Sequence, residues 1–129
     1  MKQVCGIWFP ESDTHFKSGM IDEQGNYQKD TFDAAMFYVK EPKIFYDIGA
    51  HVGLWSLMAA RAGFKEIYAF EPNPITYACL EKNVHGIAKI YNRAVSHESA
   101  QVDVIEECVN NSGAVKLTYG SGSIIASRI

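Results

Sequence analysis

The chain has 129 residues, of which 47% are hydrophobic, and this is enough apolar material for one globular domain with a single core. A formal net charge of -3 gives no overall electrostatic reason to expect nucleic acid or an anionic membrane as a partner. No apolar run approaches the roughly 20 residues that cross a bilayer, and the first residues lack the apolar core of a signal peptide. We therefore expect a single cytoplasmic domain over residues 1–129.

The three cysteines indicate neither a disulfide framework nor a zinc site. Cys5, Cys79 and Cys108 are odd in number and far apart in the sequence. We expect buried free thiols and no metal site.

Residues 1–42 are expected to form an N-terminal cap followed by a helix. An apolar strand over Val4–Phe9 ends at Pro10, and a polar, hairpin-like stretch follows with turn signals at 18–19 and 25–26. Three aromatic residues of this cap could line a ligand pocket, but such residues more often anchor a segment to the core: Trp8, Phe9 and Phe16.

The helix of this region is expected over residues 31–40. Asp30 or Thr31 can cap its start, and Pro42 stops it because proline disfavours a helical conformation in the residue before it. The apolar residues at helical spacing are Phe32, Ala35, Met36 and Val39.

Residues 43–95 alternate short strands with helices, which predicts a Rossmann-like α/β core. Asn73 can cap the second of these helices, with Pro74 as its first residue, and Gly63 and Gly86 terminate the two helices. Short connections of this kind predict parallel strands in the order 3-2-1 with flanking helices. The expected strands are Ile44–Ile48, Glu66–Phe70 and one starting at Lys89–Tyr91, and the expected helices are Val52–Ala62 and one from Pro74 with a core stripe of Ile75, Ala78, Cys79 and Val84.

In residues 96–129 apolar and polar residues alternate with a period of two, and this pattern predicts an antiparallel hairpin. Strands near 102–106 and 114–119 flank the turn-forming residues Asn110–Gly113. We expect a solvated strand edge at Glu106-Glu107 and a flexible tail at Gly120–Ser123.

Two acidic residues and a glycine turn share one edge of the predicted sheet. Asp47 ends the first strand just before Gly49, and Glu71 closes the second strand 22 residues after that glycine. An acidic residue at this spacing is placed to accept hydrogen bonds from the ribose hydroxyls of an adenosine. Gly49 lets the backbone approach a ligand, and Gly53 lets the helix start lie against the strand. The less favoured alternative is a pair of ordinary strand-end carboxylates.

Departures from the dinucleotide fingerprint indicate which adenosine compound binds. That fingerprint needs glycine at positions 51 and 54, where this chain has His51 and Leu54. His51 would crowd a pyrophosphate, and Asp47 would repel it, so an NAD-dependent oxidoreductase is disfavoured. The ammonium and sulfonium of S-adenosylmethionine suit Asp47 better.

The chain resembles the FkbM-type class I S-adenosylmethionine-dependent methyltransferases over about residues 44–119. The motifs that carry the resemblance are Asp47-Ile48-Gly49-Ala50-His51-Val52-Gly53, Ala69-Phe70-Glu71-Pro72-Asn73-Pro74, Asn83-Val84 and Asn92-Arg93-Ala94-Val95-Ser96. The family accepts asparagine or histidine at the position of His51, and its second motif reads Phe-Glu-Pro-Asn.

The resemblance implies O-methylation of a small-molecule or glycan hydroxyl, with S-adenosylmethionine as cofactor and with no catalytic residue assigned. The implied cofactor contacts are Asp47, Gly49, Ala50, His51 and Gly53 at the methionine end, Glu71 at the ribose hydroxyls, and Pro72, Asn73, Asn92 and Ala94 near the adenine. For His51, capping of the helix start is about as plausible as a cofactor contact.

The family fold is a seven-stranded sheet in the order 3-2-1-4-5-7-6, so the resemblance implies an incomplete, truncated domain here. Without a fourth strand, the strand over Ile44–Ile48 has an open edge. We expect either that the N-terminal segment covers this edge or that the chain forms a homo-oligomer. The alternative to a methyltransferase is a catalytically inactive remnant that acts as a binding or interaction module.

Overall fold

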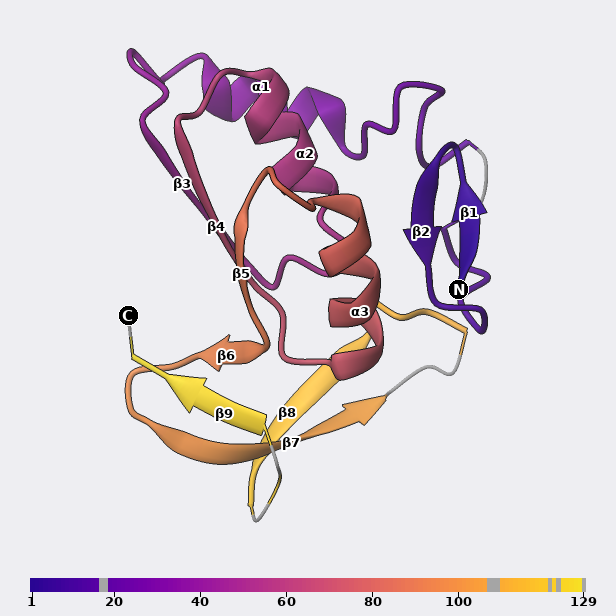
Figure 1. The fold of residues 1–129 in the computed structure, drawn as a ribbon, viewed down its shortest axis with the longest axis vertical. Helices are drawn as coiled ribbons and strands as arrows, with labels where there is room; N and C mark the ends of the chain where they lie inside the picture. Colours follow the sequence, from indigo (N-terminus) through magenta and orange to yellow (C-terminus); the bar gives the residue numbers. More distant parts are fainter. Residues whose placement is uncertain (17–18, 107–109, 121, 123, 129) are drawn as a thin grey trace.

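The computed structural model describes residues 1–16, 19–106, 110–120, 122 and 124–128. This part of the chain is a mixed α/β structure with a two-stranded hairpin, a three-stranded parallel sheet and a four-stranded sheet (Figure 1). None of its helices has the length and apolar character needed to cross a membrane.

The parallel sheet has the predicted topology. Its strands are β3 (Ile44–Ile48), β4 (Glu66–Phe70) and β5 (Lys89–Tyr91), in the order β3-β4-β5. The crossover helices α2 (Leu54–Arg61) and α3 (Pro74–Asn83) lie on one side of the sheet (Figure 1). Because β3 and β4 are parallel and Ile48 pairs with Phe70, the carboxyl ends of both strands lie at the same edge of the sheet. The turn into α2 crosses this edge.

The ends of α2 and α3 follow from their local sequences. Asn73 Oδ1 accepts a hydrogen bond from Ile75 N at 3.0 Å, and Pro74 is the first residue of α3, as predicted. Gly63 ends α2 with a φ of 91°, and its N–H donates to the carbonyl of Ala60 while the N–H of Phe64 donates to that of Ala59. These local signals determine where α2 ends and where α3 begins.

The core lies between these two helices, the sheet and the N-terminal segment. It includes Phe9, Val52, Ala69, Leu80 and Val84. Of the stripe predicted for α3, Cys79 and Val84 are buried and Ala78 is half-buried, but Ile75 is exposed because the inward position of the first turn belongs to Thr76.

The N-terminal strand predicted over Val4–Phe9 is instead a hairpin of β1 (Lys2–Val4) and β2 (Ile7–Phe9). Cys5 and Gly6 both have positive φ, 49° and 78°, and this left-handed pair reverses the chain. Cys5 is therefore exposed rather than buried, and Cys108 lies outside the described residues. The hairpin packs against α3. There the Asn83 side chain accepts a hydrogen bond from the N–H of Trp8 and donates one to its carbonyl.

The helix predicted over 31–40 is α1 (Lys29–Met36), which begins and ends earlier. Asp30 and Thr31 are inside it and cap nothing, because Gln28 precedes the helix in a left-handed conformation without a side-chain cap. Of the predicted stripe, Phe32 is buried and Met36 half-buried, whereas Ala35 and Val39 are exposed.

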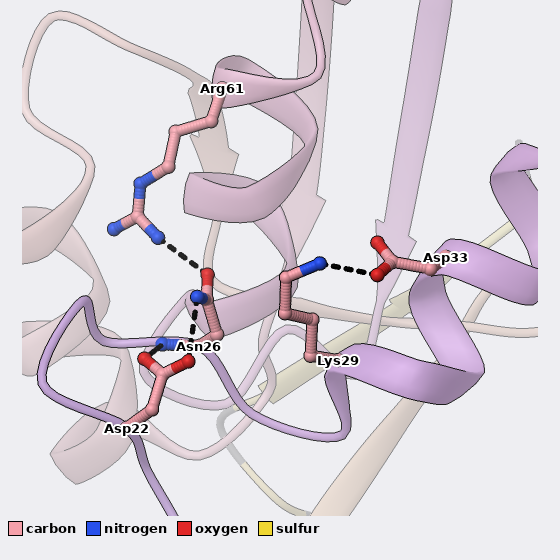
Figure 2. Close-up of polar contacts among 5 residues, drawn as sticks. All are labelled: Asp22, Asn26, Lys29, Asp33 and Arg61. Atoms are coloured by element: carbon pink, nitrogen blue, oxygen red, sulfur yellow. Dashed lines mark hydrogen bonds and ion pairs between the residues drawn. The ribbon is translucent and has the colours of Figure 1, made fainter.

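Polar contacts hold the loop before α1. Figure 2 shows Arg61 of α2 donating to Asn26 Oδ1 at 2.8 Å, Asn26 donating to Asp22 at 2.8 Å, and Lys29 paired with Asp33 in α1. The loop is thereby fastened to the end of α2.

The C-terminal region contains the predicted hairpin and two further strands, β6 (Arg93–Val95) and β9 (Ile124–Ser127), that were not predicted. β7 (Ala100–Glu106) and β8 (Val115–Tyr119) pair antiparallel, and β9 joins β7 to β6. The resulting order is β6-β9-β7-β8. The predicted flexible tail includes residues 121 and 123, which lie outside the described residues. The predicted solvated edge includes residue 107 and the side chain of Glu106, which are outside the described part as well.

The edge of β3 stays open among the described residues, since β3 pairs with β4 alone. The N-terminal segment does not supply the missing strand, because its hairpin lies on the far side of α3 from β3 (Figure 1). Ile44, Tyr46 and Ile48 are exposed on the sheet face that α2 and α3 leave uncovered. Of the two expectations for this edge, homo-oligomer formation remains a prediction.

We predict that the chain dimerises through antiparallel pairing of two β3 strands about Tyr46, which would place Ile44 opposite Ile48 of the second copy. Light scattering should then give twice the monomer mass of 14.4 kDa. Tyr46→Lys should shift the mass toward the monomer, because open edges with charged side chains resist pairing. Tyr119→Lys, at an equally exposed position on β8, is the control. A monomer mass for the unchanged chain at every concentration contradicts this prediction.

Candidate functional site

The turn between β3 and α2 crosses the carboxyl end of β4. Gly49 N and Ala50 N both donate to the carbonyl of Phe70 at 2.9 Å. Gly49 has a φ of 77°, and a Cβ placed on it would meet nothing within 4 Å, so the turn is open to a ligand there. His51 is left-handed too, with a φ of 53°, a conformation in which histidine and asparagine are enriched among residues with side chains.

Gly53 serves a packing role that differs from the predicted one. A Cβ on this residue would lie 2.7 Å from Leu80 Cδ1 and 2.8 Å from Val84 Cγ1, both on the α3 side. The glycine therefore lets the start of α2 approach α3 closely, and it does not line the cavity described below.

Asp47 is almost completely buried at the end of β3. Its Oδ2 accepts a hydrogen bond from Ser56 Oγ of α2 at 2.6 Å. Burial raises the pKa of this carboxyl, and its hydrogen bonds with Ser56 oppose that rise. Asp47 thereby fastens the first turn of α2 to the strand.

Glu71 is also buried, and protein groups already donate to both of its oxygens. Oε2 accepts from His51 N at 2.8 Å, while Oε1 accepts from Asn73 N and from Thr76 Oγ1, each at 2.9 Å. Burial raises its pKa, these hydrogen bonds oppose the rise, and the nearby charge of Asp47 adds to it. The carboxylate thus joins the β3–α2 turn to the β4–α3 turn.

The ring of His51 is packed between sequence-distant segments. It lies 5.0 Å from the ring of Phe16 and 6.2 Å from that of Phe9, measured between centroids. Its Nε2 is 2.5 Å from Ser112 Oγ, in the β7–β8 loop, so the side chain does not cap the helix start. Burial lowers the pKa of His51 from 6.5 to about 4, and the imidazole is neutral at pH 7.

Asp13 is a site residue that the sequence analysis missed. It is 1% exposed and accepts hydrogen bonds from His15 N at 2.9 Å, Phe16 N at 3.2 Å, Ser112 N at 2.9 Å and Ser112 Oγ. The hydrogen bonds from His15 N and Phe16 N form a turn closed by the aspartate side chain. An aspartate favours this kind of turn, so the sequence could have suggested it. Nothing in the sequence indicates the contact with Ser112, 99 positions away.

These elements enclose a cavity of about 330 Å³ at the carboxyl end of β3. Asp47 is the only Asp, Glu, Lys or Arg among its lining residues in the described part of the chain, and the imidazole of His51 is neutral at pH 7. The lining residues are Phe16, Tyr27, Gln28, Asp47, Ile48, Gly49, Ala50, His51, Leu54, Trp55 and Gly113.

The cavity thus brings together four of the predicted site residues: Asp47, Gly49, Ala50 and His51. The others lie elsewhere. Glu71, Pro72 and Asn73 are buried behind the turn, and Asn92 Nδ2 donates to the carbonyls of Glu71 at 2.8 Å and Pro72 at 3.1 Å.

Ala94 is the most distant of the predicted contacts. It packs with Val102 and Ala126 in the core of the four-stranded sheet, beside a separate hollow of about 200 Å³. Among the described residues no three His, Cys, Asp or Glu side chains are grouped so that they could hold a metal ion.

No protein-family model, curated protein or solved structure matches the chain.

Because Glu71 accepts three hydrogen bonds inside the protein, we predict that Glu71→Ala lowers the free energy of unfolding by about 2–4 kcal/mol. Urea denaturation followed by circular dichroism measures this change. Glu81→Ala, at an exposed position on α3, is the control and should stay within about 0.5 kcal/mol. Equal midpoints for the two variants would show that Glu71 is not a structural link.

The half-buried, neutral His51 should also make the fold sensitive to acid. Unfolded histidine binds a proton near pH 6.5, whereas folded His51 binds one only near pH 4, so the free energy of unfolding falls as the pH drops between these values. The loss is about 3 kcal/mol in full. The raised pKa values of Asp47 and Glu71 give an opposite slope, so the variant comparison is needed to isolate the effect of His51.

His51→Asn keeps a residue suited to positive φ and removes the titrating group. Denaturation curves between pH 4 and 7 should therefore show a smaller acid loss in this variant than in the unchanged protein. The same pH dependence in both proteins would contradict the assignment of a neutral imidazole with a lowered pKa.

Proposed function

We propose that this chain binds S-adenosylmethionine in the cavity at the end of β3, as the cofactor-binding part of an FkbM-like methyltransferase. One observation carries the proposal: the cavity combines the Asp47 carboxylate with the rings of Phe16, Tyr27 and Trp55, and none of the lining residues that the structure describes is a lysine or arginine. A carboxylate beside aromatic rings suits a positively charged organic ligand. The ammonium and sulfonium of S-adenosylmethionine meet that requirement.

The arrangement of the elements supports the same proposal. In open parallel sheets, ligands bind outside the carboxyl ends of the strands, which is where this cavity lies. The order β3-β4-β5 with crossovers through α2 and α3 is that of the first half of a class I methyltransferase sheet. We propose that the chain has this fold in incomplete form.

The residues that would hold the cofactor's amino-acid end are Asp47, Gly49, Ala50 and His51. Asp47 would attract the ammonium, and the absence of a Cβ at Gly49 leaves room for close approach. When bound, the cofactor supplies a methyl group on a cationic sulfur, which a hydroxyl of a small molecule or glycan can accept. The chain's own contribution is to bind and orient, because proximity supplies much of the rate enhancement in such displacements.

Glu71 fits a supporting role better than a direct ribose contact. The residue is 4% exposed, and its carboxylate oxygens already accept hydrogen bonds from His51, Asn73 and Thr76. A ribose hydroxyl would have to share or displace these donors. We therefore propose that Glu71 holds the turn from behind while Asp47 faces the ligand.

The second candidate is an inactive remnant that serves as an interaction module. It is favoured by the burial of Glu71 and by the position of Pro72, Asn73, Asn92 and Ala94 outside the cavity. An NAD-dependent enzyme is disfavoured, because a pyrophosphate in this cavity would meet the Asp47 carboxylate and, among the described lining residues, no lysine or arginine.

Isothermal titration with S-adenosylhomocysteine, which carries the same ammonium group, tests the proposal. We expect binding that Asp47→Asn weakens at least tenfold, since the amide keeps the shape of the side chain but loses its charge. Asp33→Asn, at an exposed position on α1, should bind as the unchanged protein does. NAD should not bind. A folded protein that does not bind S-adenosylhomocysteine would refute the proposal and favour the interaction module.

A further inference from the structure

A chain of hydrogen bonds, Asp13–Ser112–His51, links three distant segments to the cavity wall. Ser112 Oγ bonds Asp13 Oδ2 on one side and lies 2.5 Å from His51 Nε2 on the other. The segments of Asp13 and Ser112 are joined again by the N–H groups of Thr14 and His15, which donate to the carbonyl of Asn110 at 2.9 Å and 3.1 Å. The position of the Ser112 hydroxyl is therefore fixed from both sides.

The direction of these bonds follows from the charge of Asp13. Burial alone would raise the pKa of Asp13, but its hydrogen bonds with Ser112, His15 and Phe16 together lower it below the ordinary value. An ionised carboxylate only accepts hydrogen bonds, so the single hydroxyl proton of Ser112 goes to Asp13. Ser112 Oγ must then accept from His51, which requires the proton of the neutral imidazole to be on Nε2.

This tautomer leaves a lone pair on Nδ1 of His51. No described residue donates to Nδ1, and no buried side-chain nitrogen or oxygen in that part of the chain lacks a partner. Nδ1 is therefore accessible, and His51 is one of the residues that line the cavity. The Asp47 carboxylate and the His51 imidazole, each with a hydrogen-bond acceptor, thus belong to residues that line one cavity.

We propose that Asp13 is a positioning residue that acts through Ser112 to fix His51 as its Nε2–H tautomer, so that Nδ1 accepts a hydrogen bond from the ligand in the cavity. The ligand part of this inference rests on the proposed function. The cavity then selects a ligand that presents hydrogen-bond donors on a cationic group, as an α-amino group does. Asp13 and Ser112 influence this selection although neither lines the cavity.

The same residue types occur in hydrolytic triads, but the order of the contacts argues against a nucleophilic serine. In a triad, histidine lies between serine and aspartate and takes the serine proton. Here Ser112 lies between Asp13 and His51, and its proton is directed to the aspartate. His51 donates to Ser112 and cannot act as its base.

Nitrogen-15 NMR of histidine-labelled protein at pH 7 tests the inference. We expect the unchanged protein to show a protonated Nε2 and an unprotonated Nδ1 for His51, with the Nδ1 signal shifting when S-adenosylhomocysteine is added. Ser112→Ala should lose the tautomer preference and weaken binding about tenfold. Ser112→Thr, which keeps the hydroxyl, should retain both, and Ser99→Ala, at an exposed position, is the control.

Each outcome decides the inference. An Nδ1–H tautomer in the unchanged protein, or a tautomer and affinity that Ser112→Ala leaves unchanged, overturns it without affecting the proposed function. The expected tautomer with no binding of S-adenosylhomocysteine overturns the proposed function and the ligand role of Nδ1. The measurement on the free protein thus separates the two failures.

Discussion

The structure around the β3–α2 turn depends on hydrogen bonds that protein groups donate to three buried carboxylates. Asp13, Asp47 and Glu71 are 1%, 9% and 4% exposed, and removing a charged carboxylate from water is costly unless protein donors replace the water. Their donors come from backbone N–H groups and hydroxyls of different segments. Satisfying them fixes the N-terminal loop, the start of α2, the turn into α3 and the β7–β8 loop relative to one another.

The position and polarity of the cavity follow from these links. Segments that carry aromatic rings, such as those of Phe16 and Trp55, are held over an open glycine turn beside the one carboxylate that faces the space. Since His51 is neutral, none of the lining residues that the structure describes places a positive charge beside Asp47. The same turn could hold a phosphate in another protein, but in this chain its surroundings favour a cation.

Local sequence signals predicted the parallel core, because glycine turns, the Asn73 cap and short connections leave few alternative topologies. Asp47 and His51 were placed correctly at the turn for the same reason. The Asp13–Ser112 contact could not be predicted, since it joins residues that only tertiary folding brings together. β9 was missed because it follows a glycine- and serine-rich stretch, and the first hairpin because Cys5 adopts a left-handed turn that cysteine seldom occupies.

A crystal structure of the complex with S-adenosylhomocysteine tests the central claim most directly. We predict that the amino-acid end of the ligand lies in the cavity beside the β3–α2 turn, with its ammonium about 3 Å from an oxygen of Asp47. A ligand bound elsewhere on the chain, or one that enters this cavity with its carboxylate or adenine toward Asp47, would contradict it.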